Sequence, residues 1–181
     1  GIEKLVAAKA DTLEAGLDAA KAIMTTDTVH KQIAVSCELD GKTVTVGGMC
    51  KGSGMIHPNM CTMLGFVTTD VNISKEMLQK AVSASVEDSF NMISVDGDTS
   101  TNDTLLVLAN GLAGNEEINA EGAAYAAFCE ALNYITMYLA KKMAGDGEGA
   151  TALFECQVVG ADTVKNAKTL AKSVICSSLS K

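Results

Sequence analysis

The sequence contains no arginine, and its 14 basic residues are all lysines in a chain with a net charge of −8. Proteins that bind nucleic acids neutralise phosphates with clustered Lys and Arg, and arginine is the commonest reader of base edges. Here only Lys141 and Lys142 are adjacent. The composition therefore argues against a nucleic-acid partner, whereas an acidic balance aids solubility and weakly attracts a cationic amine.

Long hydrophobic runs are also missing. No uncharged apolar run approaches the roughly 18–20 residues that a membrane-spanning helix needs. No signal peptide is visible at Gly1, where a short amphipathic segment begins. We therefore expect a soluble, cytoplasmic protein with no membrane contact.

Histidine is scarce, and the six cysteines show no CxxC spacing. With only His30 and His57 to combine with cysteine, a zinc site is not expected. We favour free buried thiols in a reducing cytosol, with disulfides as the alternative.

Hydrophobic periodicity predicts an α/β mixture with several antiparallel strands, in one domain over residues 1–181. Two alternating runs joined by Asp40-Gly41 are a strong hairpin signal, over residues 32–39 and 43–49. Further strands are expected at 63–68, 104–109 and 151–159. Helices are expected at 11–24, 74–93, 119–144 and 162–175, beginning at Asp11, Ser74, Asn119 and Asp162.

One stretch, residues 51–70, combines features of a reactive site. It begins with a lysine between glycines, passes through Pro58, the only proline, and reaches Thr62 before an apolar segment. A flexible loop with one cation, a rigid turn and a hydroxyl at the start of a strand could bind and process a substrate. On its own this pattern is weak, because most threonines at strand starts pack or cap.

The same stretch resembles the self-cleavage motif of the ornithine acetyltransferases, which are bifunctional glutamate N-acetyltransferases of arginine biosynthesis. The matching segments are KGSGMI at 51–56, PNMCTML at 58–64 and TTD at 68–70, and Cys61 stands where the family usually has alanine. Additional family-like stretches are AIMTTDT, VDGDTSTND and GDGEGAT, which begin at Ala22, Val95 and Gly145.

The resemblance implies a layered αββα sandwich and a chain that is the middle part of a longer family member. It also implies self-cleavage between Cys61 and Thr62, which divides the chain into an α-type segment, 1–61, and a β-type segment, 62–181. The two segments would pair as a heterodimer, and the heterodimers as a heterotetramer.

Thr62 is the implied catalytic residue. A threonine hydroxyl is a weak nucleophile until a base takes its proton. Once the bond from Cys61 is cut, the α-amino group of Thr62, with a pKa of about 7.7–8.0, can be that base. Thr62 would then accept acetyl from N-acetylornithine and pass it to glutamate, without a metal or cofactor, although acetyl-CoA is an alternative donor.

Three further residues match substrate-binding positions of the family, namely Thr25, Lys51 and Glu148. Lys51, in a glycine-rich loop, can meet a carboxylate as a point charge, and Glu148 can hold the cationic amine of ornithine. Without the resemblance, Thr25 belongs to a helix-end turn and the other two are solvated loop residues.

Asp96, Asp98 and Asp103 invite a calcium hypothesis, but the positions of glycine and glutamate do not fit an EF-hand loop. Aspartates that accept hydrogen bonds from nearby backbone groups are the favoured interpretation. The sequence thus predicts an acetyltransferase activated by autoproteolysis. The alternatives are an amide hydrolase or aminopeptidase with the same threonine nucleophile, or an inactive structural fragment.

Overall fold

The sheet begins with the predicted hairpin. In the computed structural model, which describes residues 1–57 and 63–181, β1 (Lys31–Leu39) pairs antiparallel with β2 (Lys42–Lys51). Asp40 and Gly41 form the turn with φ values of 52° and 73°. Two positive φ values in a two-residue loop are typical of a type I′ turn, whose twist matches that of the strands. The hairpin prediction is confirmed.

The other two strands complete a mixed sheet with the order β1-β2-β3-β4. The third strand, β3 (Leu64–Thr69), runs antiparallel to β2, and β4 (Thr104–Ala109) runs parallel to β3. The parallel pair requires a crossover, which the chain makes through a helix. The predicted α/β class is therefore confirmed as one mixed four-stranded sheet with helices.

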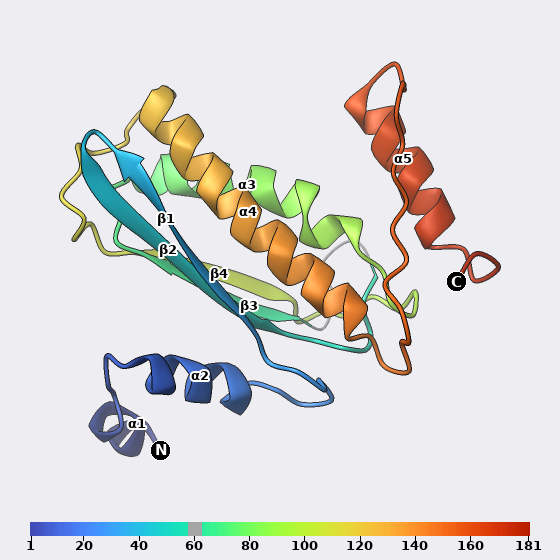
Figure 1. The fold of residues 1–181 in the computed structure, drawn as a ribbon, viewed down its shortest axis with the longest axis horizontal. Helices are drawn as coiled ribbons and strands as arrows, with labels where there is room; N and C mark the ends of the chain where they lie inside the picture. The colour runs from blue at the N-terminus through green and yellow to red at the C-terminus, as the bar shows by residue number, and fades with distance from the viewer. Residues whose placement is uncertain (58–62) are drawn as a thin grey trace.

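Helices flank this sheet on both sides (Figure 1). α3 and α4 lie on one side and α2 lies on the other, while α5 stands away from the sheet. No helix in the described part of the chain is long and apolar enough to cross a membrane. The helices are α1 (Ile2–Ala7), α2 (Leu13–Ala22), α3 (Lys75–Asp88), α4 (Ala123–Gly145) and α5 (Val164–Ile175), with a 3₁₀ turn at Phe90–Met92.

Side-chain caps fix where three of the helices start. Ser74 caps α3 as predicted, and its hydroxyl accepts a hydrogen bond from Met77 N. α2 and α5 are capped instead by Thr12 and Thr163, each one residue after the predicted aspartate. In both cases the threonine hydroxyl, not the aspartate, accepts from the third backbone N–H of the helix.

Two helix boundaries differ from the prediction by several residues. α4 begins at Ala123 instead of Asn119, because its N-cap Gly122 has an extended backbone, with φ 170° and ψ −170°. The helix predicted over 74–93 ends at Asp88 and is followed by the short 3₁₀ turn.

The strand predicted over residues 151–159 is wrong. This segment is extended chain without strand pairing, and Leu153, Phe154 and Val159 are 45%, 47% and 80% exposed. Alternating hydrophobicity indicates compatibility with a pleated surface, but a strand also needs a neighbour to bond with its backbone. Among the described residues, all four strands of the sheet lie elsewhere.

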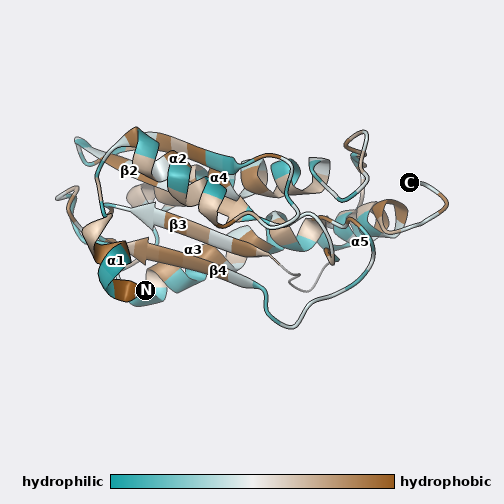
Figure 2. Ribbon diagram, turned by 90° about the horizontal axis from the view of Figure 1, so that it is seen from below, coloured by the Kyte–Doolittle hydropathy of each residue, from teal (hydrophilic) through white to brown (hydrophobic). Residues whose placement is uncertain are grey.

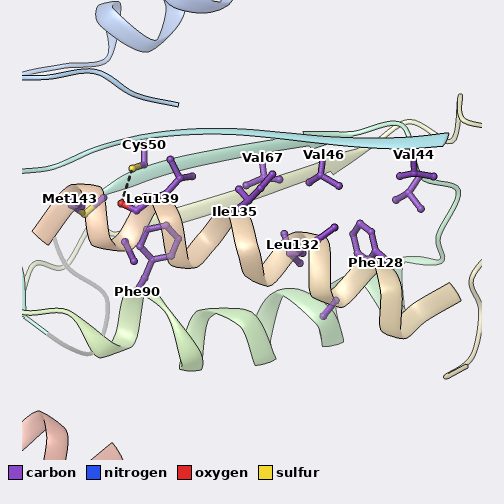
Figure 3. Packing of buried hydrophobic residues seen from close by; sticks show 14 of the residues in the cluster. Val44, Val46, Cys50, Val67, Phe90, Phe128, Leu132, Ile135, Leu139 and Met143 are labelled. Carbon is purple, nitrogen blue, oxygen red and sulfur yellow. Dashed lines mark hydrogen bonds between the residues drawn. The ribbon is translucent and has the colours of Figure 1, made fainter. Parts of the chain in front are cut away.

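The core lies between the sheet and α4 (Figure 3). Alternate residues of β2 and β3 point toward α4, and the α4 residues that meet them recur every three or four positions. Figure 3 shows the two sets facing each other, with Phe90 contributing from the far side of α4. The sheet contributes Val44, Val46, Cys50 and Val67, and α4 contributes Phe128, Leu132, Ile135, Leu139 and Met143.

The opposite face of the sheet is apolar but partly open. Met49, Phe66 and Leu106 are aligned across three strands, and Leu108 follows on β4. Leu106 and Leu108 are 44% and 55% exposed. Figure 2 shows β4 drawn mainly in the brown of hydrophobic residues. Both faces of this sheet therefore carry hydrophobic side chains, and α4 covers only one of them.

Gly47 and Gly48 are adjacent in β2 and face opposite sides of the sheet, so substituting each one probes the packing of one face. A Cβ at Gly48 would lie 2.9 Å from Ile135 Cγ2, whereas one at Gly47 would meet only ordinary contacts at 3.9 Å and beyond. We expect Gly48→Ala to lower the free energy of unfolding by about 1–3 kcal/mol through overpacking. Gly47→Ala should change it by no more than about 0.5–1 kcal/mol, and in the stabilising direction. Urea denaturation measures both, and equal losses in the two variants would contradict the packing described.

Candidate functional site

Three chain segments meet at one end of the sheet to form the candidate site. They are residues 23–30 before β1, residues 51–57 at the end of β2, and residues 145–149 after α4. The second and third are joined by a hydrogen bond from Glu148 N to Ser53 O, at 2.7 Å. The first and second are joined by a bond from Gly52 N to the Asp27 carboxylate, also 2.7 Å. Backbone contacts therefore fix the segments that carry the predicted substrate residues.

The structure brings Thr25, Lys51 and Glu148 together around the glycine-rich loop. Lys51 Nζ donates a 3.4 Å hydrogen bond to Thr25 Oγ1. A Cβ placed on Gly54 would lie 3.0 Å from Glu148 Oε2, so the glutamate carboxylate lies directly against that glycine. Thr25 and Glu148 are exposed and Lys51 is half-buried. The Thr25 hydroxyl and the Lys51 ammonium therefore lie together, and the Glu148 carboxylate lies beside Gly54 on the same loop.

Thr62 and Cys61, the predicted nucleophile and cleavage partner, lie outside the described residues, as does Pro58. The described residues on either side are firmly held. Before the gap, Ile56 N donates to Asp96 Oδ1 at 2.9 Å, and Ile56 O accepts from Val95 N at 2.7 Å. Residues 95–103 thus anchor the chain that leads into the Thr62 motif.

After the gap, the same segment holds Met63, which follows Thr62 in sequence. Met63 N donates to Asp103 Oδ1 at 2.9 Å, and Met63 O accepts from Thr104 N at 3.1 Å. The predicted local contact is confirmed for Asp96, which accepts from Asp98 N, but Asp96 and Asp103 also accept from backbone groups 40 residues away, which the sequence did not predict. The VDGDTSTND stretch and Thr104 therefore hold the described residues on both sides of the predicted self-cleavage motif.

The pKa values of Asp96 and Asp103 are shifted in opposite directions, although both carboxylates accept backbone hydrogen bonds. Burial raises the pKa of Asp103, and the Met63 amide and the Lys51 charge only partly oppose this. Its Oδ2 is buried without a hydrogen-bond partner among residues 1–57 and 63–181. For Asp96, burial also acts upward, but the amides of Met55 and Ile56 outweigh it and hold the pKa below its usual value.

Sequence reasoning missed a buried ionic cluster beneath the site, made of Asp27, Lys31 and Asp146. Lys31 Nζ lies 2.6 Å from both carboxylates, and the lysine side chain is fully buried. Burial acts to raise the pKa of each aspartate, but bonds from Lys31 and from Gly52 or Thr28 outweigh it and hold both pKa values low. Losing one member of such a cluster typically costs about 3–5 kcal/mol.

A signal for this cluster was present in the strand pattern. Lys31 has the same parity as Ile33, Val35 and Cys37, and so belongs to the inward-facing set of β1. A lysine at an inward position requires buried acceptors nearby. The sequence alone does not identify them, because Asp146 is 115 positions away.

Within residues 1–57 and 63–181, no group of three or more His, Cys, Asp or Glu is arranged to hold a metal ion. Burial raises the pKa of the Cys50 thiol to about 12, which leaves it protonated at neutral pH. The cysteines of the described segments are free, namely Cys37, Cys50, Cys129, Cys156 and Cys176.

A pocket of about 660 Å³ lies beside the site, between the C-terminal ends of α3 and α4, residues 149–156 and α5. Glu148 lines it, but Thr25 and Lys51 do not. Thr25 and Lys51 therefore lie outside this pocket, whereas Glu148 lies between the pocket and the loop that carries Gly54.

The described residues thus form an α/β fold in which a hydroxyl, an ammonium and a carboxylate lie along one anchored loop. Comparison with known proteins identifies the family. The ArgJ family model matches residues 1–181, and the chain belongs to this family.

Similar proteins agree with this assignment. An arginine biosynthesis bifunctional protein ArgJ of Symbiobacterium thermophilum is 57% identical over 97% of this chain and 44% of its own length. One from Clostridium acetobutylicum is 57% identical over 88% of this chain and 39% of its own. The crystal structure of the ArgJ protein of Bacillus halodurans is 49% identical, with a TM-score of 0.62 over 64% of this chain and 55% of that one. The chain thus spans less than half the length of these two curated relatives.

The opposite pKa shifts of Asp96 and Asp103 give a paired prediction on stability. The Asp103 carboxylate disfavours folding above its raised pKa, so we expect Asp103→Asn, which keeps an acceptor for Met63 N, to increase stability at pH 7. This gain should shrink as the pH falls toward the unfolded value of about 3.9. Asp96→Asn should instead lower the free energy of unfolding at pH 7. This loss should disappear as the pH falls through the lowered pKa of Asp96.

Urea denaturation between pH 3 and pH 7 measures both effects. Changes of the same sign in the two variants at pH 7 would contradict the different environments assigned to the two carboxylates.

Proposed function

We propose that this chain is part of an acetyltransferase that moves acetyl from N-acetylornithine to glutamate through an acetyl-Thr62 intermediate. The observation that carries the proposal is the convergence of Thr25, Lys51 and Glu148 on the loop that leads to Thr62. Membership of the ArgJ family supports it, since the relatives are described as bifunctional proteins of arginine biosynthesis.

Self-cleavage would prepare the nucleophile. The Thr62 hydroxyl attacks the carbonyl carbon of Cys61, the acyl group moves from nitrogen to oxygen, and the hydroxyl proton passes to the released amine. Water then hydrolyses the ester, which leaves a carboxylate on Cys61 and a free α-amino group on Thr62. That amine, with a pKa of about 7.7–8.0, then serves as the base for the same hydroxyl.

The transfer itself has two half-reactions. Thr62 Oγ attacks the acetyl carbonyl of N-acetylornithine, and the Thr62 amine passes the proton to the departing amine of ornithine. The amine of glutamate then attacks the acetyl ester, which yields N-acetylglutamate and regenerates Thr62. These steps need no metal or cofactor, and acetyl-CoA remains an alternative acetyl donor.

We assign the binding roles by charge. Lys51 meets a substrate carboxylate as a point charge, and Thr25, whose hydroxyl lies 3.4 Å from Lys51 Nζ, contacts the same part of the ligand. Glu148 holds the cationic side-chain amine of ornithine. The exposed Glu148 carboxylate lies against Gly54, which is consistent with a ligand approaching along this loop.

Cleavage between residues 1–61 and 62–181 would cut the chain between two neighbouring strands. β2 belongs to the first segment and β3 to the second, and their ladder runs from Val46–Thr69 to Lys51–Leu64. Such contacts would keep the α-type and β-type segments together as a heterodimer after the cut. We further propose that heterodimers pair to a heterotetramer in the cytosol.

The open apolar face of the sheet supports the layered αββα sandwich. Met49, Phe66 and Leu106 lie side by side on the face away from α4, and Leu106 is 44% exposed. Exposed apolar faces of this kind are normally covered in the complete protein. A second sheet from the remaining length of the protein would cover them.

The direct test compares glutamate with water as the acetyl acceptor, in the full-length protein. N-acetylornithine should acetylate Thr62, which mass spectrometry of the Thr62 peptide detects, and added glutamate should discharge it to N-acetylglutamate. Thr62→Ala should abolish both steps, because losing an essential nucleophile costs several orders of magnitude in rate.

Two outcomes favour the alternatives. Acetate released at the same rate with and without glutamate indicates an amide hydrolase with the same nucleophile. No acetylation of Thr62 in the cleaved full-length protein indicates a chain without this activity.

A further inference from the structure

The buried Lys31 cluster joins the three segments that form the candidate site. Lys31 is the first residue of β1, Asp27 lies in the loop before it, and Asp146 caps the end of α4. The lysine ammonium uses all three of its donors, at 2.6 Å to each carboxylate and 3.3 Å to Val29 O. Every proton of this buried charge is therefore matched to an acceptor.

Each aspartate also binds backbone at the site. Asp27 Oδ1 accepts from Gly52 N at 2.7 Å, and Asp27 Oδ2 accepts from Thr25 N at 3.2 Å. The Asp27 carboxylate thus accepts hydrogen bonds from Thr25 and from Gly52, which directly follows Lys51. The separation between these two segments is set by the geometry of a single carboxylate.

The second aspartate completes the arrangement from the α4 side. Asp146 accepts from Thr28 N at 3.1 Å, from Val29 N at 3.4 Å and from the Thr28 hydroxyl. Glu148 lies two residues further along, and its own N–H bonds Ser53 O. The position of Glu148 relative to Lys51 is therefore determined by both Asp146 and the Ser53 contact.

Removing the lysine would leave two carboxylates facing one buried space. Their mutual repulsion would drive them apart, and with them the loop that carries Thr25 and the turn that carries Glu148. Buried ion pairs are weak contributors to net stability compared with apolar groups of similar shape. The geometric effect of this cluster is therefore separable from its effect on stability.

We propose that Lys31 is a positioning residue for substrate binding, which sets the spacing of Thr25, Lys51 and Glu148 through Asp27 and Asp146. Lys31 does not touch the substrate, since its side chain is fully buried. This inference rests on the proposed function, because its readout is the affinity for N-acetylornithine.

The test uses a variant that removes the charges without leaving one unpaired. The triple variant Asp27→Asn, Lys31→Met, Asp146→Asn keeps side chains of similar length but removes all three charges and the ionic bonds between them. We expect it to fold and to cleave at Thr62, with the KM for N-acetylornithine raised at least 10-fold and kcat per acetylatable Thr62 changed less than 3-fold. A role in stability alone would lower the melting temperature and the active fraction, but not the KM of the folded enzyme.

The exposed ion pair between Lys80 and Glu121 provides the matched control, with side chains 56% and 66% exposed. Lys80→Met combined with Glu121→Gln removes the same type of charges far from the site and should leave KM, kcat and melting temperature unchanged. If the triple variant fails to fold, Thr28→Val is the second test, because this substitution removes only the hydrogen bond from the Thr28 hydroxyl to Asp146. We expect a KM about 3-fold higher for it.

The outcomes separate this inference from the proposed function. A wild-type enzyme that transfers no acetyl contradicts the proposed function itself. An active wild type together with wild-type KM in the folded triple variant overturns the role of Lys31. Wild-type KM in Thr28→Val overturns it if the triple variant is unfolded.

Discussion

The site depends on one ammonium group held between two carboxylates inside the protein. Lys31 lies 2.6 Å from both Asp27 and Asp146, and no other described ion pair is buried to the same degree. Burying three charges is costly unless all are paired and hydrogen-bonded, a condition that restricts the surrounding backbone to one arrangement. The glycine-rich loops at the site are flexible by composition and receive their geometry from this cluster.

The sheet provides the second constraint, because it connects segments on both sides of the proposed cut. β2 ends at Lys51 and β3 starts at Leu64, and these two residues are partners in the antiparallel ladder. The chain between them therefore leaves β2 and enters β3 at the same end of the sheet. Asp96 and Asp103 hold its two ends on one neighbouring loop. A reactive bond in this segment would be presented between fixed ends.

Local sequence signals predicted most elements, because turn and capping chemistry acts over a few residues. Asp40-Gly41 and Ser74 are examples in which the predicted group makes the expected contact. The predicted strand at 151–159 failed because pairing is a tertiary property. Thr25, Lys51 and Glu148 followed from family resemblance, whereas the Lys31 cluster was missed because its members meet only in the folded chain.

Intact mass measurement and N-terminal sequencing of the purified full-length protein show whether Thr62 becomes an N-terminal nucleophile. We expect two polypeptides, one of which begins Thr62-Met63-Leu64. A single uncut polypeptide would contradict it, since Thr62 would then lack the free amine that serves as its base.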